Sequence, residues 1–129
     1  MKKLVALIGF VLMGILASCD KNESSPEDLY GKWKATEYLA DPGDGSGTWQ
    51  KVKGAPKYFK LDKDGTVSGE IFSGFTKFKV LDTNRIEFTG DKDKSPLIFH
   101  YYFLGRTLQF TPLQPMCIEP CGRRYIKSN

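Results

Sequence analysis

The stretch Leu97-Ile98-Phe99-His100-Tyr101-Tyr102-Phe103-Leu104 is the most apolar part of the chain after its first 18 residues, and it decides the fold class. Its eight residues are too few for a membrane-spanning helix, which needs about 20. Its aromatic content favours a β-strand. Both faces of this strand are apolar, so we expect Phe99, Tyr101 and Phe103 to fill an interior. Ile98, Tyr102 and Leu104 then need cover from outside, from a short helix, a loop or another protein.

Period-two alternation and turn residues predict further short strands on both sides of this stretch. Asp64-Gly65 predicts a hairpin of 57–62 with 66–72, because glycine accepts positive φ in such a turn. A second hairpin is expected to pair two strands, so that Phe78 and Val80 lie opposite Ile86 and Phe88. The sequence predicts about nine strands, at 32–39, 48–53, 57–61, 66–72, 75–81, 85–89, 97–104, 107–111 and 123–127.

The connections between these strands are too short for crossover helices, which predicts antiparallel neighbours. Closing an up-and-down sheet removes its exposed edges. We therefore expect an all-β fold, a small barrel or a strongly curled half-barrel, after a short helical turn that begins at Pro26 and ends at Gly31. In the first strand, alternation predicts that Ala35 and Glu37 share one face and that Tyr38 lies on the other.

The first 18 residues have the pattern of a secretory signal. Lys2 and Lys3 precede an uncharged run of 14 residues, which is too short to span a membrane. Leu16-Ala17-Ser18-Cys19 then resembles the lipobox of bacterial lipoproteins, in which the cysteine is acylated and the bond before it is cut. The resemblance implies a signal peptide at 1–18, an acylated tether at 19–25 that begins with a lipid anchor on Cys19, and one β domain at 26–129. An ordinary signal followed by a chance cysteine is the alternative.

Charge and cysteine content restrict the classes of function. The whole chain has 19 Lys and Arg against 15 Asp and Glu, and residues 19–129 carry a net charge of about +2. Nucleic-acid binding needs a clustered basic face, so we expect no nucleic-acid partner. Cys117 and Cys121 are expected to form a disulfide in an oxidising compartment. Half of a metal site is the alternative, but the sequence places no histidine or further cysteine near the pair, and we expect no metal.

Residues suited to catalysis are scarce. His100 is the only histidine, and the sequence offers no Ser/His/Asp ordering, cysteine nucleophile or phosphate-binding loop. We therefore expect neither enzymatic activity nor a cofactor. A small barrel can instead hold one apolar ligand, or be filled by its own side chains. Under the first alternative the candidate ligand-binding residues are Phe59, Phe78, Phe99, Tyr101, Phe103, Trp49 and Tyr38.

Several motifs occur in a recognisable order along the chain. After the lipobox come Leu29-Tyr30-Gly31-Lys32-Trp33, the stretch 59–67, Leu104-Gly105-Arg106-Thr107-Leu108, and Cys-x-x-x-Cys-Gly-Arg-Arg-Tyr at 117–125. In this order they resemble the small lipocalin-like lipoproteins of Gram-negative bacteria. The resemblance implies a lipid-anchored protein of the cell envelope, at the outer membrane more than the inner, with a lipocalin-like binding domain.

The opening Gly-x-Trp of lipocalins matches Gly31-Lys32-Trp33. The match implies that Trp33 closes one end of the barrel and that Arg123 or Arg124 covers its ring by a cation–π contact. This chain is shorter than transport lipocalins and has no obvious long C-terminal helix, so the size of its cavity stays open.

A second class of function is also open. The chain could be a surface interaction module that binds a glycan, an envelope protein or a host protein, or acts as an inhibitor. A hollow interior lined by Phe99, Tyr101 and Phe103 would favour ligand binding. A filled interior, with Trp49, Tyr58 or Tyr102 exposed together, would favour a partner surface.

Overall fold

The computed structural model describes residues 26–41, 44–116 and 121–129. The predicted signal peptide, tether, Cys19 and Cys117 lie outside these residues. Within the described ranges, no helix combines the length and the apolar character needed to cross a membrane.

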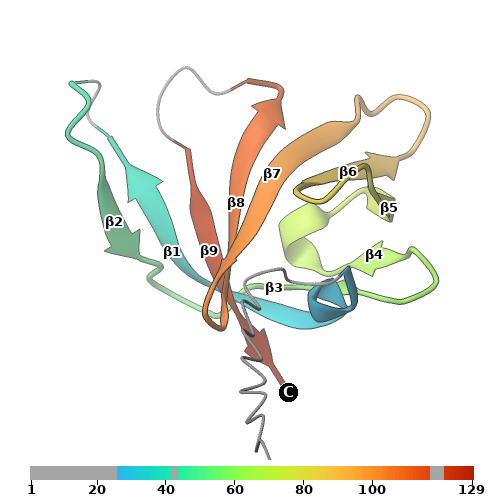
Figure 1. Ribbon diagram of the computed structural model, residues 1–129, viewed down its shortest axis with the longest axis horizontal. Coiled ribbons are helices and arrows are strands. Elements are labelled where there is room, and N and C mark those ends of the chain that lie inside the picture. The colour runs from blue at the N-terminus through green and yellow to red at the C-terminus, as the bar shows by residue number, and fades with distance from the viewer. Residues whose placement is uncertain (1–25, 42–43, 117–120) are drawn as a thin grey trace, which may run out of the picture.

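The structure is all-β, as predicted, apart from two short 3₁₀ turns (Figure 1). Each of the nine strands falls within or close to a predicted one, whereas η2 was not predicted. The elements are η1 (Pro26–Leu29), β1 (Gly31–Ala40), β2 (Thr48–Lys51), β3 (Tyr58–Leu61), β4 (Val67–Ser68), η2 (Glu70–Phe72), β5 (Phe75–Val80), β6 (Arg85–Gly90), β7 (Leu97–Leu104), β8 (Thr107–Gln114) and β9 (Arg123–Ser128).

Eight strands curl into a nearly closed antiparallel barrel in the order β4-β3-β1-β9-β8-β7-β6-β5, and β2 pairs with β1 beside this ring. The seam lies between β4 and β5. There a single antiparallel bridge joins Thr66 to Lys77, and the Phe78 backbone N–H donates to the Gly65 carbonyl at 2.9 Å. The predicted second hairpin is confirmed, with Phe78 opposite Phe88 and Val80 opposite Ile86.

A bulge in β1 corrects one prediction. The register of β1 against β9 shifts between Ala35 and Glu37, and a bulge changes which side chains face inward after it. Ala35 and Tyr38 line the same internal cavity, whereas Glu37 forms an ion pair with Arg124, which alternates along β9 with the buried Tyr125. The prediction that Ala35 and Glu37 share a face is therefore wrong.

The predicted strand 66–72 is also corrected, because β4 ends at Ser68 and the chain turns into η2. Gly69 makes this possible with a φ of 106°, a backbone conformation that is essentially restricted to glycine. The turn directs Phe72 into the barrel, where its ring stacks on Phe88 with centroids 4.2 Å apart. A segment that was expected to form a strand of the barrel wall thus supplies a side chain that fills the interior.

Trp33 closes the end of the barrel next to η1. Its side chain is 1% exposed, its Nε1 donates to the Leu29 carbonyl at 2.8 Å, and its ring centroid lies 6.1 Å from that of Phe103. The cation over Trp33 is Lys127, at 5.4 Å from the ring centroid.

The predicted pairing of Trp33 with Arg123 or Arg124 is therefore wrong. β9 runs antiparallel to β1 with Lys127 opposite Trp33, which places the two arginines opposite Tyr38 and Glu37, further along β1. Arg124 covers Trp49 instead, with its guanidinium carbon 3.7 Å from the ring centroid.

The outer face of β7 keeps part of its apolar surface exposed in the described structure. Leu104 is 46% exposed and Tyr102 is 36% exposed. The Tyr102 hydroxyl accepts a hydrogen bond from the Gln109 side-chain amide, whose Oε1 in turn accepts one from Arg124 Nε at 3.0 Å. Polar side chains on β8 and β9 therefore provide part of the outer cover that the sequence analysis expected for this face of β7.

Candidate functional site

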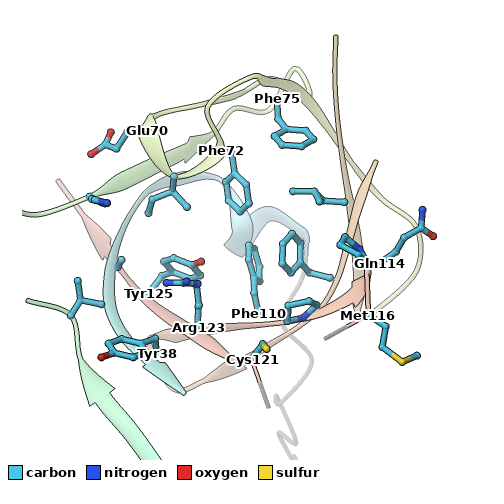
Figure 2. Close-up of a pocket in the computed structure, with 18 of the residues that line it drawn as sticks. Tyr38, Glu70, Phe72, Phe75, Phe110, Gln114, Met116, Cys121, Arg123 and Tyr125 are labelled. Carbon is cyan, nitrogen blue, oxygen red and sulfur yellow. The ribbon is translucent and has the colours of Figure 1, made fainter. Parts of the chain in front are cut away.

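The barrel is filled at one end and open at the other. Trp33 and the residues packed on it fill the end next to η1. At the opposite end, a cavity of about 1020 Å³ lies between the last residues of β1 and β8, the first residues of β7 and β9, η2, and the connection from β2 to β3 (Figure 2). We call this cavity the cup. Small-molecule sites in proteins commonly have volumes of about 300–1,000 Å³, so the cup can hold a ligand.

The floor of the cup consists of aromatic rings that the core already holds in place. Phe72, Phe110 and Tyr125 all line the cup, yet each is at most 5% exposed. Behind them Phe59 packs with its ring centroid 5.0 Å from Phe72 and 4.9 Å from Tyr125. Rings fixed from behind offer apolar contact area at little cost in side-chain entropy.

The walls are mostly apolar and half-buried. Phe99 stacks on Phe110 with centroids 5.3 Å apart, and Leu97 and Phe75 continue the apolar lining towards the mouth. On the side of β1 the lining residues are Ala35 and Tyr38, and the small side chain of Ala35 leaves room for a ligand. The mouth carries exposed apolar side chains as well, since Met116 is 81% exposed.

Charged lining residues are few and mainly positive. Lys53, Lys57, Arg123 and Glu70 line the cup. Glu70 accepts a hydrogen bond from the backbone N–H of Tyr58 at 3.0 Å. The ion pairs found among the described residues lie elsewhere, so none of the three cations is paired with a carboxylate there.

Tyr125 brings a polar group to the floor. Burial raises the pKa of its phenol above the usual 10.0, and the nearby Arg123 lowers the pKa by a smaller amount. The phenol is therefore neutral at physiological pH and can donate a hydrogen bond. In Figure 2 the Tyr125 side chain lies in the cup with Arg123 beside it. No described residue forms a hydrogen bond with the Tyr125 hydroxyl.

The structure separates the predicted ligand-binding residues into three groups. Phe99 and Tyr38 line the cup. The other predicted aromatic residues of the interior belong to the core or pack against it: Phe59, Phe78, Tyr101 and Phe103. Trp49 lies outside the barrel, where Arg124 covers it.

Sequence reasoning missed the aromatic floor and the arginine beside it. Alternation along the predicted strands 107–111 and 123–127 would have placed Phe110 inward and Arg123 and Tyr125 on one shared face. Phe72 is harder to find, because a strand was expected there. The glycines on either side of its turn, Gly69 and Gly74, both have positive φ and were the available signal.

The predicted disulfide and the possible metal ligands are considered next in relation to the cup. Cys121 is half-buried and lines it, but Cys117 lies outside the described residues, so the Cys117–Cys121 disulfide stays a prediction. Among the described residues, no three His, Cys, Asp or Glu side chains are grouped so that they could hold a metal ion.

Comparison with known proteins leaves the cup as the main guide to function. No protein-family model matches the chain. No curated protein matches it either.

Proposed function

We propose that this chain is a lipoprotein of the Gram-negative cell envelope, anchored through Cys19, whose lipocalin-like domain binds a small apolar molecule in the cup. The observation that carries the binding function is the cavity of about 1020 Å³ with its floor of core-held aromatic rings. Such a site combines apolar contact area with a shape that exists before the ligand arrives. The signal pattern, the lipobox and the order of motifs support the anchor and the location.

The described surface favours ligand binding over the alternative of a partner surface. Trp49 is covered by Arg124, and the Tyr58 ring is covered by Lys32, whose Nζ lies 4.3 Å from the ring centroid. Each of these two rings therefore has one face covered by a cation, and the Tyr102 hydroxyl is engaged by the Gln109 side chain. The chain has one histidine, and it lies on β7 outside the cup lining, so we place the protein among binding proteins and not among enzymes.

Binding can be measured with N-phenyl-1-naphthylamine, an uncharged apolar probe whose fluorescence rises in apolar surroundings. Titration of the purified protein with this probe is expected to show a saturable rise. Ala35→Phe puts a ring into the cup beside the floor, and we expect it to weaken binding of the probe by about tenfold or more, a loss of about 1.4 kcal/mol.

Leu39→Phe is the matched control, because Leu39 lies on the same strand next to Tyr38, and therefore on the opposite face, and does not line the cup. This variant is expected to bind the probe within about twofold of the unmodified protein, that is, within about 0.4 kcal/mol. Absence of a saturable rise in the unmodified protein would refute binding in the cup, whatever the stability of the variants. An equal loss of binding in both variants would refute it as well.

A further inference from the structure

The cup has a cationic side and an apolar side. Its three cations are all placed by β1 and the strands next to it. Arg123 on β9 is opposite Tyr38. The connection that carries Lys53 and Lys57 is bonded to β1 at both ends, through Val52 N–H to the Thr36 carbonyl at 2.9 Å and Ala35 N–H to the Lys57 carbonyl at 3.0 Å.

Tyr125 belongs to the same side, because it pairs with Ala35 across β1 and β9. Its phenol is neutral and forms no hydrogen bond with any described residue, although the side chain is only 2% exposed. A phenol hydroxyl that no protein group engages can donate a hydrogen bond to a ligand in the cup. Arg123 and the Tyr125 hydroxyl thus bring a charged donor and a neutral donor to one part of the cup (Figure 2).

The opposite side of the cup is apolar. η2, β5 and β7 supply Phe72, Phe75, Leu97 and Phe99 there. Among the described lining residues Glu70 is the one carboxylate, and it accepts the Tyr58 backbone N–H. The three cations outnumber it, so the net charge of these lining residues is positive. A ligand with a positive charge would meet three cations, and a wholly apolar ligand would leave the two donors of Arg123 and Tyr125 without acceptors.

We infer that the ligand is an amphiphile with an apolar body and a single carboxylate-type acid group. The apolar body lies on Phe72, Phe99 and Phe110. The acid group lies at the β1 side, where it accepts hydrogen bonds from the Arg123 guanidinium and the Tyr125 hydroxyl, and Lys53 and Lys57 add positive charge at the mouth. This inference rests on the proposed binding function and specifies the chemical class of the ligand.

The inference can be tested by displacement of N-phenyl-1-naphthylamine with decanoate and with decanol. The two competitors have the same chain length and differ in the head group. Decanoate is expected to bind about tenfold or more tightly than decanol, because hydrogen bonds between charged groups are stronger than those to a neutral hydroxyl. Raising the salt concentration is expected to weaken the binding of decanoate and not that of the uncharged probe.

Arg123→Gln and Arg124→Gln form a matched pair on neighbouring positions of β9. Arg123 lines the cup, whereas Arg124 lies on the outer face over Trp49. Arg123→Gln is expected to weaken decanoate by about tenfold more than it weakens decanol, and Arg124→Gln is expected to keep the preference for decanoate. Tyr125→Phe, which removes only the hydroxyl, is expected to weaken decanoate by about fivefold.

Different results would overturn the two proposals. A protein that binds the probe but takes up decanol as tightly as decanoate would overturn the acid-group assignment and leave apolar binding intact. Equal effects of the two arginine substitutions on decanoate would do the same. If the unmodified protein binds neither the probe nor either competitor, both the assignment and the proposed function fail.

Discussion

Trp33→Ala is expected to lower the free energy of unfolding by about 3–5 kcal/mol, the range typical of a fully buried aromatic residue. The indole is 1% exposed and its Nε1 donates to the Leu29 carbonyl. Truncation therefore removes the ring that closes the filled end of the barrel and leaves a buried carbonyl without its donor. Urea unfolding followed by circular dichroism measures the change.

Trp49→Ala is the matched control for this prediction. Trp49 is half-buried on β2 and contacts Arg124 on the outer face, so its loss is expected to cost about 1 kcal/mol. If Trp33→Ala is too unstable to fold, Trp33→Phe keeps part of the contact and still reports the difference. Equal destabilisation by the alanine substitutions at Trp33 and Trp49 would contradict the role of Trp33 as the closing residue.

Gly69→Ala is expected to destabilise the protein by about 3–5 kcal/mol, from backbone strain together with a steric clash. The φ of Gly69 is 106°, and a Cβ at this position would lie 2.5 Å from the Tyr58 carbonyl oxygen and 2.8 Å from the Phe59 Cα. Both contacts are with the backbone of β3, so β3 and η2 must separate. The separation would withdraw Phe72 from the floor, so the variant is also expected to lose binding of N-phenyl-1-naphthylamine.

Gly54→Ala separates the strain from the clash. Gly54 also has a positive φ, 91°, but a Cβ there would have no neighbour within 4 Å. Its substitution is expected to cost about 1 kcal/mol from conformational strain alone and to leave probe binding intact. Thermal unfolding of the two variants compares them directly, and similar losses of stability would show that the packing of η2 against β3 is not important.

The sequence was sufficient for the sheet, because the features that define it are local. The apolar run of β7 and the Asp-Gly turn before β4 each act over a few residues, and short connections leave antiparallel pairing as the simple solution. The pairing of Phe78 with Phe88 followed from a short turn alone.

The cup could be predicted only in part, because it depends on departures from regular strand geometry. The bulge after Ala35 brings Tyr38 inside, and the turn at Gly69 brings in Phe72. Period-two alternation assumes that neither event happens. The register of β9 on β1, which joins the two ends of the domain, sends Arg123 to the cup and Lys127 to Trp33. The sequence of neither strand contains a local pattern that predicts how two such distant strands align.

The description of the interior as either hollow or filled was too simple. Tyr101 and Phe103 belong to or pack against the core, whereas Phe99 lines the open cup. A small domain needs a large aromatic core to be stable, and this barrel concentrates that core at the end next to η1. The aromatic rings at the boundary between the two parts serve the core on one side and form the floor of the cup on the other.

The central claim, that the cup holds an apolar ligand, is tested most directly by native mass spectrometry. The protein would be isolated from its own membranes and measured before and after organic extraction, together with the Ala35→Phe variant. We expect an additional mass on the unmodified protein that extraction removes and that the variant lacks. A bare protein mass, both as isolated and after incubation with decanoate, would contradict the account.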